Sequence, residues 1–363
     1  KASVRINFFL LFSYLYHICT LTITPMRTRF LTPIFVLVFL SQLFYVSAQE
    51  PLFPIEEKGK YGYINKSGKI IVDLQFDFAE SFSEGMAAVS KAGKRGYVDQ
   101  TGKLVIPLQF DKTTPFSEGI ASGKMNGSWV YFDKTGKVII EPKCDYAYKF
   151  SDGMARLQIG SKMGFINKTG SFVVNPTYDG AYDFSEAMAR VKKGNKWGYI
   201  DKTGKVAVDF QYDDCFDFLE GYANIRKGED VGGKWGFIDK TGKVVLDLKY
   251  DRAWPFSEGM ALIRVGDFKK GRYGYINKTG EIVIAATFTG GDYFKEGYAC
   301  VTSSLDTKNA TFQFIDKKGT MVINKNFKYL TVFKNGLAKV SSPDMKAGYT
   351  YGYIDKTGKY VWP

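Results

Sequence analysis

The chain has 363 residues and a formal net charge of +13 at pH 7, and aromatic residues make up 16% of it. One histidine and four cysteines exclude most histidine-dependent catalysis and most histidine-ligated metal sites. No stretch keeps a 3.6-residue period over the length of an ordinary helix, whereas aromatic and β-branched residues are frequent, so the composition favours strands.

The first 48 residues contain no acidic residue and differ from the rest of the chain. Basic residues follow Met26, an apolar stretch runs from Phe30 to Val46, and a small-residue cleavage site ends at Ala48. This pattern predicts a signal peptide over residues 26–48, with a membrane anchor as the alternative. We expect residues 1–25 to be an upstream extension outside the protein and residues 49–59 to be a lead-in. The expected location is periplasmic, on the cell surface or secreted.

From residue 60 to residue 363 the chain repeats one pattern. Lys-Trp-Gly-Tyr-Ile-Asp-Lys-Thr-Gly-Lys-Val begins at Lys196. Similar segments begin at Lys60, Lys94, Ser128, Lys162, Lys234, Arg272, Phe312 and Tyr351. Their turn glycines are 34 residues apart in the first four steps and 38 or 39 apart afterwards, and a Phe-Ser-Glu-Gly-Met-Ala segment or a variant of it follows the first eight. The chain therefore contains eight full repeats and a terminal hairpin.

Each repeat predicts a hairpin followed by a third strand. An Asp or Asn opens the hairpin turn by accepting backbone amides, and a Gly closes it where left-handed backbone is needed. The residues that define this signature are Trp197, Gly198, Asp201, Gly204, Trp235, Gly236, Asp239, Gly242, Phe184, Phe218, Glu220, Phe256 and Glu258. The length variation lies after the Phe-Ser-Glu-Gly segment, which predicts an exposed loop there.

One such unit cannot bury its aromatic rings alone, whereas stacked neighbours can. The glycine beside the signature ring leaves a gap that we expect neighbouring atoms to fill, so valine at Gly198 or Gly236 should be strongly destabilising. The sequence predicts an all-β tandem array of short meander units, and we favour an open solenoid or superhelix capped by the last hairpin. A closed β-propeller is the alternative, although propeller blades usually have four strands and about 40 or more residues.

The repeated unit, with its later Tyr-Asp and Phe-Ser-Glu-Gly-Met-Ala segments, closely resembles the WG-repeat family over residues 60–363. The resemblance implies an all-β repeat array, common in bacteria and often exported, and it brings no catalytic residues. The signature tryptophan is present only at Trp129, Trp197 and Trp235. Val130 and Gln313 replace the signature glycine, so we expect local distortion in the third and eighth repeats.

Three kinds of side chain are candidates for chemistry or binding. The repeated carboxylates can bind cations or hydrolyse glycosides, or they can bond backbone amides in their own turns. We favour the last interpretation because every repeat offers the same pair of acids. The turn lysines form a row that can attract an anionic polymer, or they are solvated turn residues that guard an edge. This row includes Lys134, Lys168, Lys202, Lys240 and Lys278. Trp254 lies outside the signature position and is the best single candidate for an exposed contact.

Cleavage at Ala48 removes His17 and Cys19, and it leaves three cysteines at unrelated repeat positions. We therefore expect buried free thiols, no disulfide framework, no metal site and no cofactor. The predicted protein is a non-enzymatic exported repeat protein that presents an extended protein-binding or scaffolding surface. The first alternative is a binder of carbohydrate or another cell-envelope polymer, and the second is a carboxylate-dependent hydrolase. We expect no nucleic-acid partner and no stable membrane insertion after signal cleavage.

Overall fold

The computed structural model describes residues 50–267, 270–304, 310–323, 325–341 and 351–363. The predicted upstream extension and signal peptide, with His17 and Cys19, lie outside the described residues. The described residues form strands and turns in nine separate antiparallel sheets. Among them no helix is long and apolar enough to cross a membrane.

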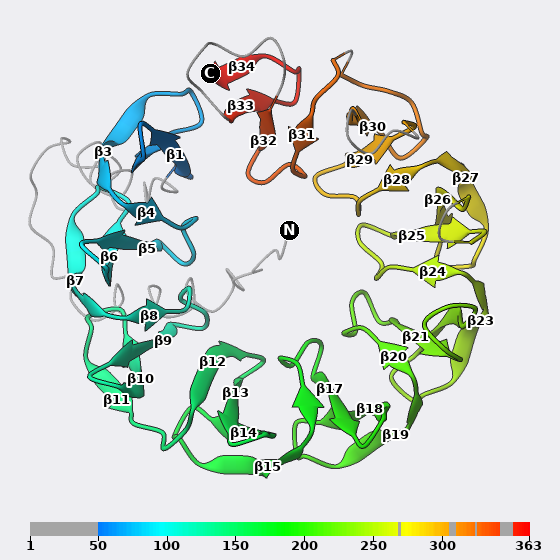
Figure 1. Ribbon diagram of the computed structural model, residues 1–363, viewed down its shortest axis with the longest axis horizontal. Coiled ribbons are helices and arrows are strands. Elements are labelled where there is room, and N and C mark those ends of the chain that lie inside the picture. The colour runs from blue at the N-terminus through cyan, green and yellow to red at the C-terminus, as the bar shows by residue number, and fades with distance from the viewer. Residues whose placement is uncertain (1–49, 268–269, 305–309, 324, 342–350) are drawn as a thin grey trace, which may run out of the picture. The chain divides into compact units, whose positions relative to one another are not determined.

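Each sheet is one blade, and its strands follow chain order from the centre of the ring outward (Figure 1). The first strands are β4 (Phe78–Ala79), β8 (Lys112–Thr113), β12 (Tyr146–Ser151), β16 (Gly180–Ala181), β20 (Asp214–Cys215), β24 (Arg252–Ala253), β28 (Gly290–Gly291) and β31 (Tyr329–Leu330). The second strands are β1 (Phe53–Glu57), β5 (Met86–Lys91), β9 (Ile120–Met125), β13 (Met154–Ile159), β17 (Met188–Lys193), β21 (Ala223–Lys227), β25 (Met260–Val265), β29 (Ala299–Thr302) and β32 (Leu337–Ser341).

The third strands carry the tryptophan-glycine signature or its variants. They are β2 (Lys60–Ile64), β6 (Lys94–Asp99), β10 (Ser128–Asp133), β14 (Lys162–Asn167), β18 (Lys196–Asp201), β22 (Lys234–Ile238), β26 (Arg272–Asn277), β30 (Gln313–Ile315) and β33 (Gly352–Asp355). The fourth strands are β3 (Ile70–Phe76), β7 (Leu104–Phe110), β11 (Val138–Ile140), β15 (Phe172–Tyr178), β19 (Val206–Tyr212), β23 (Val244–Tyr250), β27 (Ile282–Phe288) and β34 (Tyr360–Trp362). We number the blades 1 to 9 in chain order, so blade 1 is β1–β3 and blade 9 is β31–β34.

Residues 50–363 close into a nine-bladed β-propeller, so the prediction of an open solenoid or superhelix was wrong and the alternative is correct (Figure 1). The error arose because the structural unit does not begin where the sequence repeat begins. Each blade combines the second half of one sequence repeat with the hairpin of the next, so nine hairpins make nine blades. The terminal hairpin β33–β34 completes blade 9 by pairing with β32, and it is not an end cap.

The seam between blades 9 and 1 makes the same kinds of contact as the other blade interfaces. Tyr353 donates a hydrogen bond of 2.9 Å to the carbonyl of Pro54, and its ring lies 5.6 Å from that of Phe53. The predicted lead-in therefore contains β1, which belongs to blade 1. A side chain added at the turn Gly68 would meet the backbone carbonyl of Val361 across the seam, and one added at Gly102 would meet the side chain of Val72 across the neighbouring interface.

Thirty-four residues are enough for a four-stranded blade because most first strands contain only two residues, as in β16 and β20. The sequence predicted three strands for each unit, and the aromatic-Asp link supplies the fourth. The hydrophobic core is divided into nine clusters, and each joins residues of two consecutive blades. This arrangement confirms that a unit buries its rings only against its neighbours.

The signature glycines allow the third and fourth strands to approach closely. An added side chain at Gly198 or Gly236 would lie about 2.6 or 2.5 Å from a carbonyl oxygen of the fourth strand in the same blade. Where this glycine is replaced, the fourth strand is disturbed, as predicted. β11, opposite Val130, has three residues, and in blade 8, opposite Gln313, only isolated bridges replace the fourth strand.

The length variation lies in exposed loops between second and third strands, as the spacing predicted. Residues 228–232, between β21 and β22, are exposed, and residues 266–267 and 270–271 lie at the corresponding place between β25 and β26. Because the strands are antiparallel, these loops lie on one face of the ring, while the Ser-Glu-Gly and Asp-Lys-Thr-Gly turns lie on the opposite face. We call the first the loop face and the second the turn face.

Candidate functional site

On the turn face, the Glu of each Ser-Glu-Gly turn has left-handed backbone. The φ angles of Glu84, Glu186 and Glu220 are 52°, 52° and 54°. The next residue also has positive φ in each case, and it is a glycine except after Glu186, where Ala187 has a φ of 67°. Two consecutive positive φ angles define a tight type I′ hairpin turn, for which Asn-Gly is the preferred sequence. A glutamate in this conformation is unfavourable, so another interaction must stabilise it.

That interaction is a hydrogen bond to the next blade. The carboxylate of Glu84 in blade 2 accepts the amides of Glu118 (2.6 Å) and Gly119 (2.9 Å) in blade 3. The same contact joins Glu118 to Gly153, Asp152 to Ala187, Glu186 to Gly221, Glu220 to Gly259, Glu258 to Gly297 and Glu296 to Gly336. The expectation that these acids bond amides in their own turns was therefore wrong, because their partners lie one blade further along.

The turn lysines belong to the same contacts. Lys134 lies 3.4 Å from the Glu84 carboxylate and donates to the carbonyl of that residue at 2.7 Å. Equivalent ion pairs join Lys168 to Glu118, Lys240 to Glu186, Lys278 to Glu220, Lys317 to Glu258 and Lys356 to Glu296. Four of the five lysines predicted to form a binding row are thus paired with carboxylates. Lys202 faces the shorter Asp152 and makes no ion pair with any described residue.

We call these contacts between successive blades the carboxylate ladder. Its exceptions lie next to blade 1, which has no first strand among the described residues and no Ser-Glu-Gly segment in its sequence. Blade 9 precedes it, and Asn335 replaces the glutamate there with φ 53°. Blade 2 follows it, and Gln100 replaces the lysine that would have no glutamate to contact. Both substitutions are visible in the sequence, but their reason is visible only in the ring.

The sequence pattern of the WG containing repeat matches eight segments of this chain, at residues 61–94, 96–129, 131–162, 163–197, 197–229, 235–267, 273–302 and 314–342. The chain belongs to the WG-repeat family. No curated protein matches it. Among solved structures, it is similar to a eukaryotic initiation factor at 12% identity, over 86% of this chain and 95% of that one, with a TM-score of 0.59. That likeness concerns the fold alone.

Two further structures are less similar to this WG-repeat propeller, and neither supports a functional argument. A protein of unknown function from Bacteroides caccae shares 14% identity over 56% of this chain and 89% of that one, with a TM-score of 0.28. Oligopeptidase B from Leishmania major shares 8% identity over 82% of this chain and 54% of that one, with a TM-score of 0.42.

The WG-repeat signature residues occupy structural positions. Asp201 accepts the amides of Thr203 (2.8 Å) and Lys205 (3.1 Å), and Asp239 does the same in the next blade. Gly204 and Gly242 have φ angles of 84° and 83°, as the turn requires. Three phenylalanines are buried against third-strand rings, at centroid distances of 4.8 to 4.9 Å. They are Phe184, Phe218 and Phe256.

The second set of carboxylates stabilises the loop face. Asp213 lies between blades 5 and 6, accepts Lys196 of blade 5 at 2.6 Å and accepts the amide of Gly228 in blade 6 at 2.9 Å. Asp77 and Asp251 make the same pair of contacts. The pKa of Asp213 lies below its ordinary value, chiefly because of the Lys196 ammonium.

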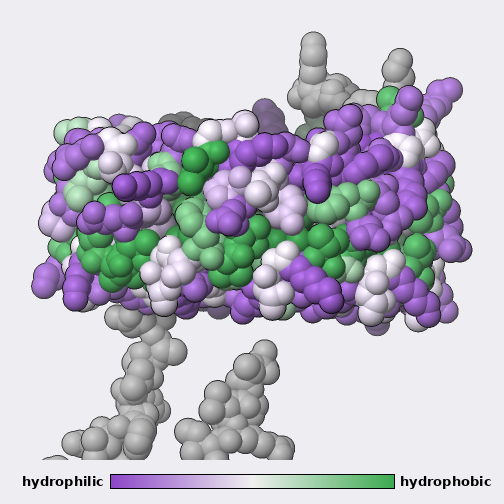
Figure 2. Space-filling view, turned by 90° about the horizontal axis from the view of Figure 1, so that it is seen from below, coloured by the Kyte–Doolittle hydropathy of each residue, from purple (hydrophilic) through white to green (hydrophobic). Residues whose placement is uncertain are grey.

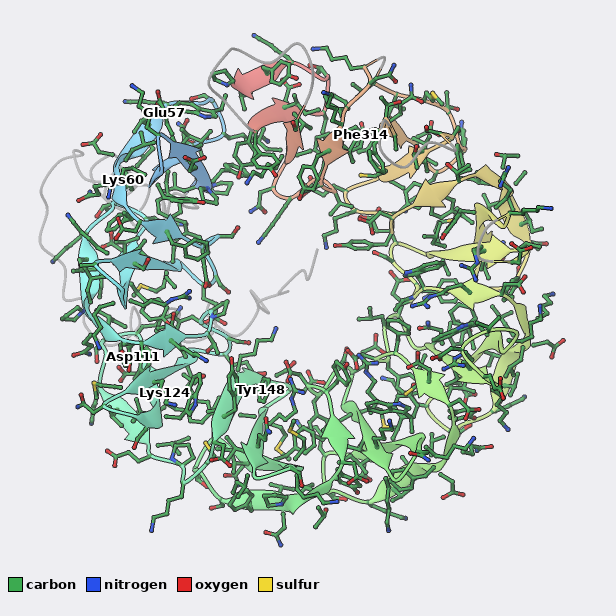
Figure 3. All side chains as sticks on the ribbon, viewed as in Figure 1. Glu57, Lys60, Asp111, Lys124, Tyr148 and Phe314 are labelled. Atoms are coloured by element: carbon green, nitrogen blue, oxygen red, sulfur yellow. The ribbon has the colours of Figure 1, made fainter. Side chains whose placement is uncertain are left out.

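Arginines and aromatic rings alternate across blades 4 to 7, in a series that sequence reasoning missed. The guanidinium of Arg156 lies 3.6 Å from the ring of Tyr148, and that of Arg190 lies 3.4 Å from the ring of Tyr182. We call this series the arginine–aromatic row, and it consists of Tyr148, Arg156, Tyr182, Arg190, Phe216, Trp235, Arg252 and Trp254. Figure 3 shows Tyr148 on the side of blade 4 that faces the ring centre.

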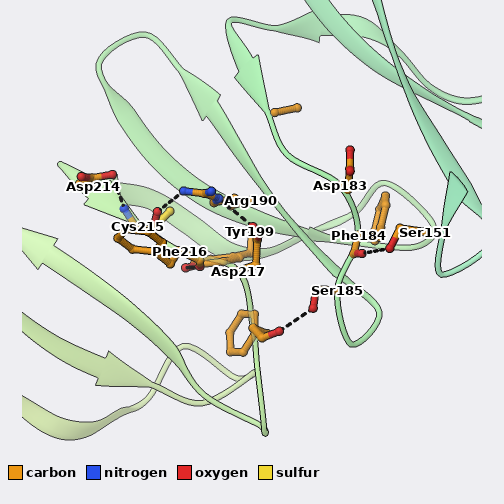
Figure 4. A network of polar contacts seen from close by, with 12 residues as sticks. Ser151, Asp183, Phe184, Ser185, Arg190, Tyr199, Asp214, Cys215, Phe216 and Asp217 are labelled. Carbon is orange, nitrogen blue, oxygen red and sulfur yellow. Dashed lines mark hydrogen bonds and ion pairs between the residues drawn. The ribbon is translucent and has the colours of Figure 1, made fainter. Parts of the chain in front are cut away.

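Arg190 is held by protein groups on both sides. Its Nε donates to Asp217 at 2.7 Å, and another guanidinium nitrogen donates to the carbonyl of Cys215, so it joins blades 5 and 6 (Figure 4). Burial raises the pKa of Asp217, and Arg190 opposes that effect. The buried Ser122 and Asn224 make corresponding bonds to the next blade, which shows that this position serves blade packing.

The row ends in a pocket between blades 6 and 7 on the loop face. Its volume is about 680 Å³, and its lining includes Asp214, Trp235, Arg252, Trp254 and Tyr273. Trp254, the predicted surface contact, is partly buried and packs against Tyr273, with ring centroids 5.6 Å apart. A predicted binding residue therefore lies here in a sizeable pocket with other polar and aromatic groups.

The three cysteines in the described part of the chain are free thiols. Cys215 and Cys300 are buried, and Cys144 is partly buried. Burial raises the pKa of Cys144 to about 11 and that of Cys215 to about 12, so these thiols are not activated nucleophiles. Among the described residues, no group of three or more His, Cys, Asp or Glu side chains is placed to hold a metal ion.

Proposed function

We propose that this WG-repeat propeller is a non-enzymatic, exported scaffold that binds a partner protein on its outer rim. The main support is a repeated apolar position at the start of the fourth strands, where the side chains are between 38% and 62% exposed. These residues are Ile70, Leu104, Phe172, Val206, Val244 and Ile282. Figure 2 shows the rim edge-on, with apolar residues in a broken band between hydrophilic ones.

The rim strands also have free edges. Each pairing of a third with a fourth strand contains a register shift, as between Trp235 and Phe237 in blade 6. Bulges of this kind twist an edge and oppose uncontrolled sheet-to-sheet pairing. An exposed apolar band beside such edges is typical of a surface that contacts a partner through side chains.

The carboxylates support a binding function over hydrolysis. The Ser-Glu-Gly acids are engaged by backbone amides and lysines of the next blade, and the aspartates of the loop face are engaged in the same way. An acid–base pair needs two carboxyls with unlike environments at one place, which these repeated contacts do not provide. The same contacts occupy the turn lysines, which weakens the case for an anionic polymer on the turn face.

The test is a pull-down from envelope extract with the chain that starts at Gln49, followed by cross-linking of the recovered partner. A rim variant, Val206→Ser with Val244→Ser, should lose the partner and keep its melting temperature. A control variant, Lys91→Ser with Lys193→Ser, changes exposed residues at the loop-face ends of β5 and β17, and it should retain the partner. Equal recovery by the rim variant would reject the rim as the binding surface.

A further inference from the structure

The pocket between blades 6 and 7 is distinct from the rim. Its residues come from the loop-face ends of the two blades, and the exposed residues 230–232 and the buried Gly233 form part of its wall. The volume of about 680 Å³ lies within the range of about 300 to 1,000 Å³ that is usual for small-molecule sites. Between blades 5 and 6 the corresponding arginine is engaged, because Arg190 bonds Asp217 and the Cys215 carbonyl across the interface.

Arg252 is the unusual member of the arginine–aromatic row. Its guanidinium carbon lies 5.5 Å from the rings of both Trp235 and Trp254. Its buried Nε has no hydrogen-bond partner among the described residues, and no described carboxylate forms an ion pair with it. A buried donor without a partner is costly, so a bound group that accepts from Arg252 would be stabilised.

Asp214 lines the same pocket and supplies the opposite chemistry. One of its oxygens accepts the amide of Cys215 at 2.9 Å, and the other makes no hydrogen bond with any described residue. The other charged residues of the lining have partners of their own: Arg226 pairs with Asp230, Asp251 pairs with Lys234, and Arg264 and Asp267 also interact with other groups. Arg252 therefore leaves a donor for a ligand, and Asp214 leaves an acceptor. Hydroxyl groups both donate and accept hydrogen bonds, so an uncharged ligand with several hydroxyls can satisfy both.

The remaining wall is aromatic. Trp254 and Tyr273 are only partly buried, so the pocket exposes ring surface beside the polar groups. The negative face of an aromatic ring attracts weakly positive C–H groups, which one face of a pyranose presents. We propose that this pocket binds a neutral saccharide, with its C–H face against Trp254 and its hydroxyls bonded to Arg252 and Asp214. The site goes beyond the proposed rim function and does not depend on it.

The experiment titrates the chain from Gln49 with maltotriose, cellotriose, mannotriose and chitotriose, and follows tryptophan fluorescence and heat. We expect at least one trisaccharide to bind with a Kd below about 1 mM. Arg252→Ala and Trp254→Leu should each weaken that binding about tenfold, because each removes one contact of about that strength. Trp197→Leu is the matched control, because Trp197 is a partly buried tryptophan of blade 5 that lies beside Tyr182 of the row and outside the pocket. The Trp197→Leu protein should bind the saccharide as the parent does.

Several results would overturn the proposal. One is that no trisaccharide binds below about 10 mM. Another is that the Arg252→Ala protein binds as tightly as the parent. A third is that only trigalacturonate or inorganic phosphate binds, which would mean an anion site. If Trp254→Leu fails to fold, Arg252→Ala decides the question. Loss of the partner from the rim variant with unchanged saccharide binding would separate the two proposals.

Discussion

At the scale of single residues, the glutamate of the Ser-Glu-Gly turn shows how tertiary contacts override a local preference. A type I′ turn favours Asn-Gly, and this chain uses Asn335-Gly336 in blade 9, the blade before the one without such a turn. Glutamate or aspartate holds the position in blades 2 to 8, where the carboxylate reaches amides of the following turn. A charged hydrogen bond contributes about 1.5–3 kcal/mol, which is comparable with the cost of about 1–3 kcal/mol for left-handed backbone and therefore offsets it.

Glu186→Ala tests this balance. It removes the bonds to Gly221 and the ion pair with Lys240, and it leaves a left-handed alanine. We expect the free energy of unfolding to fall by about 1–3 kcal/mol, measured by urea denaturation. Glu141→Ala, at an exposed position outside the ladder, is the control and should change it by less than about 0.5 kcal/mol. Equal effects of the two variants would mean that the ladder contributes nothing.

The same residues predict a dependence on pH. The pKa values of Glu84, Glu118 and Glu258 lie below the ordinary 4.5. Burial alone would raise them, but hydrogen bonds from the next blade and the adjacent lysine together outweigh that effect. A lowered pKa in the folded state stabilises the protein above the unfolded value, and this stabilisation disappears as pH falls through the folded value. Urea titrations from pH 6 downward should therefore show the loss below about pH 4.5. The variant in which Glu84, Glu118 and Glu258 are all changed to Gln should be less stable at pH 6. It should also lose less free energy of unfolding as the pH falls.

At the scale of elements, the register shift between third and fourth strands depends on a glycine. Gly236 lies where the carbonyl of Leu246 crosses the third strand, and a side chain there would meet backbone atoms. Backbone cannot move aside as a flexible side chain can, so the strand pair must separate. Val130 shows the natural result, because the strand opposite it shortens to Val138–Ile140.

Gly236→Val should lower the free energy of unfolding by about 2–3 kcal/mol. Thermal melts and urea denaturation both measure this loss. Ala207→Val places the same side chain at an exposed site of β19 and serves as the control, with a change of less than about 0.5 kcal/mol. A stable Gly236→Val protein would show that the close approach is not needed.

At the scale of the whole molecule, closure joins residues from opposite ends of the described chain. Phe53 and Ile55 of β1 share a buried cluster with Leu337 and Tyr353 of blade 9. The ring has no exposed end cap, since β1 supplies the strand that faces blade 9 and β33–β34 supply the hairpin that completes that blade. A closed ring protects its first and last blades as an open stack cannot.

A double-mutant cycle on Phe53→Ala and Tyr353→Ala tests closure in solution. The rings are 5.6 Å apart, so the coupling free energy should be about 0.5–1.5 kcal/mol. The cycle of Phe53→Ala with Phe218→Ala, in a distant blade, should show no coupling beyond about 0.3–0.5 kcal/mol. Independent effects of Phe53 and Tyr353 would contradict a closed ring.

The sequence by itself determined the all-β class, the turn roles of Asp201 and Gly204, the burial of Phe184 and Phe218, and the distortion at Val130, because these depend on contacts within one repeat or on close strand pairing. Only the tertiary structure decided that nine blades close, that Glu84 serves the next blade, and that Arg252 lies in a pocket. Those features depend on the rotation between successive blades, which no single repeat encodes. A small change in that rotation turns a ring into an open array while it leaves every local signal in place.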